Sequence, residues 1–190
     1  HDGGHQAYLP RSAARVAGNP KGTTMTNDTT EIKGVVVAEL RGPDGKLKSR
    51  CETRNLITAV GDQYYAGRAV LSSSLPAQVT GMKLGAGSTA VAKTGAGAAL
   101  VTYLSDSNQA LTGGYPTAVG GVATFVATWA AGKATTASPI TEVVLVTETI
   151  SADDTSTAAE TISRALLTGI ASKAAGDSLT VTWTHTILGA

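Results

Sequence analysis

The sequence has a single cysteine, few charged residues and few aromatic residues. Cys51 excludes an internal disulfide, and we expect it to be a small buried strand residue. Charged residues make up 15% of the 190 positions, against about a quarter in ordinary globular domains, and disordered chains are usually charge-rich. No apolar run approaches the roughly 18 residues of a membrane span, and the first residues lack the apolar stretch of a secretory signal.

Alanine, threonine, glycine, valine and serine dominate instead, which favours short β-branched strands joined by loops of small residues. The net charge is +1, so we expect neither specific nucleic-acid binding nor attraction to a membrane surface. Residues 1–54 hold nine Lys/Arg and six Asp/Glu, whereas residues 55–190 hold six and eight. This mild asymmetry favours docking of the N-terminal part onto an acidic partner.

Residues 1–30 have neither helical nor strand periodicity, and their prolines, glycines and small polar residues predict an extended N-terminal arm. Such an arm cannot bury itself, so we expect a neighbouring chain to order it. Met25 is a plausible initiator, which leaves open whether the residues before it are an extension. The candidate partner-binding residues of the arm are Tyr8, Leu9, Arg11, Arg15 and Lys21.

Residues 32–54 predict a basic β-hairpin. "IKGVVVAEL" and "LKSRCETRNL" have strand character, and "RGPDGK" between them has proline and glycine in turn positions. Acidic residues alternate with the basic ones, and no aromatic residue is placed to stack on bases, which disfavours a nucleic-acid site. We expect the hairpin to face a protein partner, with Arg41, Lys46 and Lys48 as its candidate contacts.

The remainder predicts one helix followed by strands. Apolar residues in "NLITAVGDQYYAGRAVL" follow helical spacing over residues 56–71, and Asn55 is positioned to cap the helix. Five later segments have strand character, and turn signals separate them. We therefore predict a mainly β domain over residues 31–190, an antiparallel β-sandwich or flattened barrel with one short helix. The segments begin "QVTGMKL", "VATFVATW", "ITEVVLV", "TISRALL" and "DSLTVTWTHTIL".

The stretch "KLGAGSTA" imitates a dinucleotide-binding fingerprint through Gly85, Gly87 and Ala90. That motif requires a helix directly after the glycines, because the N-terminus of the helix holds the pyrophosphate. Here "VAKTGAGAALV" follows, with two glycines where a helix would continue. We interpret the stretch as a structural glycine loop, and we expect no cofactor.

Catalytic and metal-binding patterns are weak. His1, Asp2 and His5 could hold an adventitious ion, but a defined site needs three or four rigid ligands. His185 alternates with apolar residues in "LTVTWTHTIL", which predicts a packed histidine with a satisfied ring nitrogen. The pair Asp153-Asp154 is typical of a solvated turn. No serine elbow or oriented base is present, so we expect that the chain is not an enzyme.

From Asn55 to its end the chain resembles a loose family of tailed-bacteriophage virion proteins. In that family a helix leads to a glycine loop, then to a strand with a spaced aromatic, and finally to a strand of the "gDsLtvtWt" type. The stretches that match are "NLITAVGDQYYAGRAV", "VTGMKLGAGSTAVAKTGAGAAL", "ATFVATWAAGKATTASPITEVVLVTE" and "ISRALLTGIASKAAGDSLTVTWTHTIL". The apolar "VVLVTE" departs from the glycine-containing strand that is common there.

The resemblance implies a structural protein of the virion. We expect a capsid decoration or cement protein that assembles with itself, as a homotrimer or another cyclic oligomer, and binds the major capsid protein or another virion protein. A tail-fibre or baseplate component is the first alternative. A carbohydrate-binding module is the second, and it would need Trp129, Trp183 or Tyr115 as an exposed stacking platform.

Overall fold

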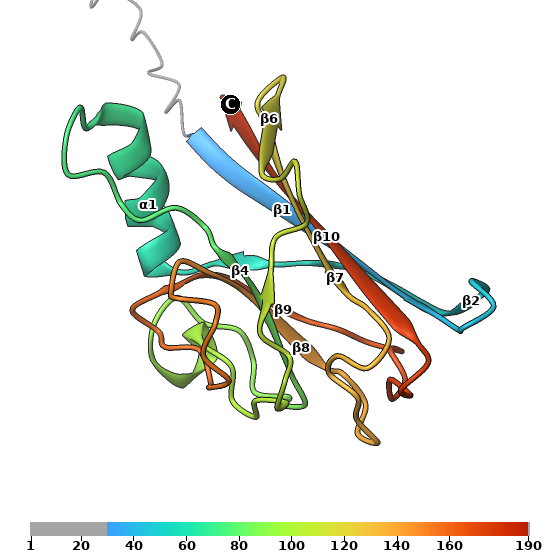
Figure 1. The fold of residues 1–190 in the computed structure, drawn as a ribbon. Helices are drawn as coiled ribbons and strands as arrows, with labels where there is room; N and C mark the ends of the chain where they lie inside the picture. The colour runs from blue at the N-terminus through green and yellow to red at the C-terminus, as the bar shows by residue number, and fades with distance from the viewer. Residues whose placement is uncertain (1–29, 190) are drawn as a thin grey trace, which may run out of the picture.

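The computed structural model describes residues 30–189, which form two facing antiparallel sheets with one helix beside them (Figure 1). Sheet A has the order β2-β1-β10-β7-β6, and sheet B has the order β3-β9-β8-β4-β5. The predicted mainly β sandwich with one helix is confirmed; the arm, apart from Thr30, lies outside the described residues. The strands of sheet A are β1 (Thr30–Arg41), β2 (Leu47–Arg54), β6 (Thr117–Val119), β7 (Val122–Trp129) and β10 (Ser178–Gly189). Those of sheet B are β3 (Leu56–Ile57), β4 (Gly81–Gly85), β5 (Gln109–Ala110), β8 (Glu142–Val146) and β9 (Thr161–Leu166).

Strand alternation places one row of side chains from each long strand in the core. In β10 the side chains of Leu179, Val181 and Trp183 are fully buried, whereas the threonines between them are partly exposed. Trp183 lies opposite Val36 of β1 and Phe125 of β7, so this row runs across sheet A. Sheet B contributes the facing core residues Met82, Leu84, Val143, Leu145 and Ile162.

The predicted hairpin over residues 32–54 is confirmed. Strands β1 and β2 pair from Val35–Arg54 to Arg41–Leu47, with a bulge after Leu40. Cys51 lies opposite Ala38 and is buried, as expected for a small strand residue.

Helix α1 (Ala59–Val70) is shorter than predicted, and Asn55 does not cap it. Leu56 and Ile57 form strand β3, which pairs with β9, so the chain is still extended where the helix was expected to begin. Thr58 is the N-cap, because its Oγ1 accepts a hydrogen bond from Gly61 N at 3.0 Å. The same hydroxyl donates to Thr161 O at 2.6 Å and thereby fixes the start of the helix against β9.

Loops cover the side of sheet B that faces away from sheet A, and a buried ion pair anchors them. Arg164 of β9 and Glu142 of β8 are fully buried and lie 2.6 Å apart, measured from Nη2 to Oε2. Glu142 Oε1 also accepts from the N–H groups of Gly87 and Thr102, each at 2.9 Å. Arg164 Nη1 donates to Thr89 O at 2.9 Å.

This anchoring explains the glycine loop. A Cβ atom at Gly85 would overlap the Glu142 carboxylate, and one at Gly87 would approach its Oε1 to 2.5 Å. The segment that follows is a loop with a short 3₁₀ turn, η1 (Gly95–Ala98), rather than a helix that could hold a pyrophosphate. The glycines therefore let the loop approach a buried carboxylate.

Candidate interaction surfaces

The predicted hairpin residues lie close together, and each forms an ion pair. Arg41 pairs with Glu39 at 2.8 Å, Lys46 with Asp44 at 3.1 Å, and Lys48 with Asp177 at 2.7 Å. The hydrogen bond from Lys48 lowers the pKa of Asp177 below its usual range. Lys48 therefore has a structural role, whereas the Lys46 side chain is 85% exposed and available to a partner. The other candidates, Tyr8, Leu9, Arg11, Arg15 and Lys21, lie outside the described residues.

The face of sheet A that points away from sheet B, called the outer face, carries threonines and valines on β10 and β7, and valines together with charged residues such as Glu39 and Arg50 on β1 and β2. One row runs from Val37 of β1 to Thr182 of β10 and Val126 of β7. Sheet B, the helix and the covering loops all lie on the other side of sheet A (Figure 1). Within residues 30–189, no layer covers the outer face, and its side chains remain partly or fully exposed.

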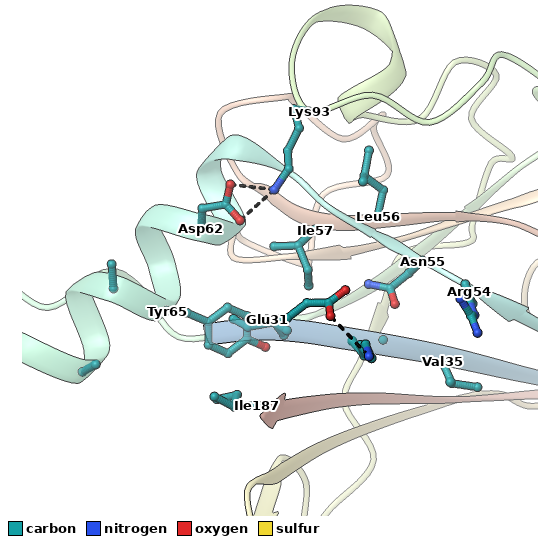
Figure 2. Close-up of a pocket in the computed structure, with 15 residues that line it drawn as sticks. Glu31, Val35, Arg54, Asn55, Leu56, Ile57, Asp62, Tyr65, Lys93 and Ile187 are labelled. Carbon is teal, nitrogen blue, oxygen red and sulfur yellow. Dashed lines mark hydrogen bonds and ion pairs between the residues drawn. The ribbon is translucent and has the colours of Figure 1, made fainter. Parts of the chain in front are cut away.

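A groove of about 830 Å³ lies between α1 and the first residues of β1; we call it the α1–β1 groove. Figure 2 shows its lining, with α1 on one side and β1 on the other. Two ion pairs mark its rim, Asp62 with Lys93 at 2.6 Å and Glu31 with Lys33 at 3.2 Å. Its apolar lining includes Ile32, Leu56, Ile57, Tyr65, Ala66 and Ile187.

His185 holds two side chains of this lining in place. It is fully buried, and Asn55 Nδ2 lies 2.9 Å from its Nε2. Asn55 and Tyr65 each hydrogen-bond to one ring nitrogen, so both nitrogens of the neutral imidazole are satisfied. The rings of Tyr65, Phe125 and Trp183 meet the imidazole edge to face. The packed histidine predicted from the alternation is therefore observed, inside the molecule and bonded to the groove.

Burial lowers the pKa of His185 to about 3, from 6.5. As the pH falls below about 6.5, His185 binds a proton in the unfolded chain but stays neutral in the folded chain. The free energy of unfolding is therefore highest above this pH and decreases as the pH falls. Between pH 7 and pH 5 we expect a loss of about 2 kcal/mol from this group. Urea unfolding at the two pH values would measure it.

A His185→Gln variant is the matched control for this prediction, because glutamine keeps an amide for hydrogen bonding but does not titrate. The variant should be less stable at pH 7 and should lack about 2 kcal/mol of the pH dependence. Parallel stability curves for the two proteins would contradict the prediction that His185 is neutral in the fold.

No cluster of metal ligands is found among the described residues. Between residues 30 and 189, no three His, Cys, Asp or Glu side chains are grouped closely enough to hold a metal ion. His185 has an amide and a phenol as partners, with no carboxylate or nucleophile beside it. No helix in this part of the chain has the length and apolarity needed to cross a membrane.

The aromatic platform required for a carbohydrate-binding module is mostly absent. Trp129 and Trp183 are both fully buried in the core, so neither can stack on a sugar ring. Tyr115 is the one of the three that is exposed, at 38%. Of the three residues, only Tyr115 could therefore contact a sugar ring.

The charged residues that sequence reasoning missed lie on sheet B. Besides Arg164 and Glu142, Lys83 of β4 is fully buried and binds Glu148 at 2.9 Å and Asp154 at 2.6 Å. Asp153 lies in an exposed loop, as expected, and accepts hydrogen bonds from Tyr103 and from the backbone of Asp106. For Arg164 and Glu142, the available signal was a single charged residue in a strand whose other residues are uncharged.

Comparisons of the chain with known protein families, with curated proteins and with solved structures found no match.

Proposed function

We propose that this chain is a non-enzymatic structural protein of a tailed-bacteriophage virion, which decorates the capsid as a symmetric oligomer. The outer face of sheet A is the observation that supports this best. It presents rows of small threonine and valine side chains that no described residue covers, as in the row Val37, Thr182 and Val126. Flat faces of this kind suit contact with copies of the same chain.

The β1–β2 hairpin would supply the contact with the major capsid protein. It extends beyond the rest of sheet A, and its exposed end carries Arg41 and Lys46 (Figure 1). Single exposed charges contribute only about 0.2–1 kcal/mol each. A cyclic oligomer compensates for this weakness because its subunits bind the shell together, at a high effective concentration.

The position on the particle tests this proposal directly. Particles of a phage that encodes the chain, labelled with an antibody against residues 30–189, should show regular label over the head in electron micrographs. Label confined to the tail would replace the decoration role by that of a fibre or baseplate component. Particles without label would contradict a virion role.

Removal of the arm provides a second readout. A chain that begins at Thr30 should fold, because residues 30–189 contain two paired sheets and a buried core between them. We expect it to bind particles at least about 100-fold more weakly than the full chain, because loss of the arm reduces multivalent binding. Circular dichroism checks the fold, and co-sedimentation with particles measures binding; undiminished binding would contradict a role of the arm.

A further inference from the structure

Strand β1 has an unpaired edge where it borders the α1–β1 groove. Strand β10 pairs with β1 along its whole length from Thr30, whereas β2 pairs with it only from Val35 onwards. The chain leaves β2 at Asn55, whose N–H donates to Gly34 O at 3.4 Å, and crosses to sheet B. The first residues of β1 therefore have no described strand on their second side.

Ile32 presents its backbone to this groove. In an antiparallel ladder, the N–H and C=O groups of every second residue point to the same side. Gly34 O accepts from Asn55 on the open side, so Ile32, two positions earlier, directs its donor and acceptor the same way. An unpaired edge of this kind is a template for an added strand.

The space beside this edge is lined mainly by apolar surface, with charged residues at its rim. Helix α1 packs against β9 and β3 rather than filling the groove. The groove volume of about 830 Å³ lies in the range of binding pockets, roughly 300–1,000 Å³. Ile32 and Ile187 pair across β1 and β10 and line it together with Tyr65 of α1 (Figure 2). An extended peptide with apolar side chains matches both the edge and the lining.

The sequence before Thr30 contains such a peptide, separated from Thr30 by a polar stretch. Between residues 22 and 29 the only large apolar residue is Met25, so this stretch is a polar spacer. Tyr8, Leu9 and Val16 lie further back, and an extended chain at about 3.3 Å per residue can place them roughly 45–70 Å from Thr30. An arm of this length can extend to the groove of a neighbouring copy. If the arm instead folded back at Thr30 onto its own groove, the polar residues 22–29 would lie against Ile32.

We propose that the α1–β1 groove binds residues 7–16 of a second copy of this chain as an added β-strand. The apolar side chains of that segment cover Ile32 and Tyr65. This assignment rests on the self-association proposed above, and it names the contact through which the oligomer forms.

Photo-cross-linking tests this assignment. A benzoylphenylalanine replaces Ala66, an exposed helix residue that lines the groove, in a ¹⁵N-labelled full-length chain. This chain is mixed with unlabelled, unmodified chain and irradiated. Mass spectrometry should find adducts on residues 7–16 of the unlabelled chain. Adducts on residues 7–16 found only in cross-linked monomers, or no adducts in this segment, would overturn the proposal.

A groove-blocking variant gives an independent measurement. Ala69→Arg places a long side chain in the groove from an exposed helix position, and Val70→Arg, 78% exposed and outside the groove, is the matched control. Ala69→Arg should weaken self-association at least about tenfold in sedimentation equilibrium, whereas Val70→Arg should leave it unchanged. Equal association of the two variants would overturn the proposal.

The two proposals fail separately. Full-length chains that cross-link through the groove but never label phage particles would contradict the virion role and leave the groove assignment intact. If instead the antibody labels the particle heads but the chains do not cross-link at Ala66, the groove assignment is contradicted and the virion role stands.

Discussion

An Arg164→Met variant should lose about 3–5 kcal/mol of its free energy of unfolding, because the change leaves the buried Glu142 carboxylate without its charge partner. Both side chains are fully buried, so water cannot replace the missing guanidinium. The donated bond to Thr89 O disappears as well, which frees part of the loop that covers sheet B. Urea unfolding at neutral pH would measure the loss.

Two further variants separate charge from packing. Glu142→Gln keeps an acceptor for the loop N–H groups but removes the negative charge, and it should be nearly as destabilising as Arg164→Met. The double variant should lose less than the sum of the two singles, because no buried charge remains. Arg50→Met, which breaks exposed pairs with Glu39 and Glu52, should cost no more than about 1 kcal/mol.

Hydrogen exchange would locate the effect of Arg164→Met in the molecule. Gly87 and Thr102 donate their N–H groups to Glu142, and we expect these amides to exchange faster in the variant than the amides of β10. Full additivity of the two single variants, with unchanged exchange at both amides, would contradict the view that the ion pair anchors the loop.

The strands were predictable because their alternation is a local property. In "LTVTWTHTIL" every second residue from Leu179 to His185 is buried in β10, and the hairpin turn was marked by proline and glycine. Strand β8 was also recognised, because four consecutive apolar residues, Val143 to Val146, indicate burial on both faces.

The helix start and the buried charges were not predictable in this way. Leu56 and Ile57 have apolar spacing compatible with a helix, and pairing with β9 overrides it. Arg164 and Glu142 are far apart in sequence and meet only because β8 and β9 are neighbours in sheet B. Likewise, the bond between His185 and Asn55 depends on the crossing from sheet A to sheet B.

The α1–β1 groove shows the same limit. Its apolar residues come from β1, β3, β10 and the helix, and no motif unites them. The groove exists because β2 pairs with β1 only from Val35 onwards, whereas β1 continues beside β10 back to Thr30, a consequence of register rather than of composition. Only the arm residues proposed to fill it, such as Tyr8 and Leu9, were singled out from the sequence.

A Gly61→Val variant should lose about 3 kcal/mol of stability, the second large effect expected here, because the helix approaches β9 too closely for a side chain at this position. A Cβ atom at Gly61 would overlap the carbonyl oxygen of Ile162 and lie 2.7 Å from Ile57 Cγ2. The obstacle is backbone, so the helix itself must move. Thermal and urea unfolding would measure the loss, with exposed Gln63→Val as the control for helix propensity.

The sign of the Gly61→Ala effect decides between two physical accounts. Helix propensity alone predicts that alanine stabilises an interior helix position by about 1 kcal/mol over glycine. Contact with Ile162 O predicts a net loss instead, because α1 must shift away from β9. That shift would also move Tyr65, so Gly61→Ala should weaken binding of a second chain's arm in the groove. A stabilised Gly61→Ala variant would contradict the close helix–strand contact on which the groove geometry depends.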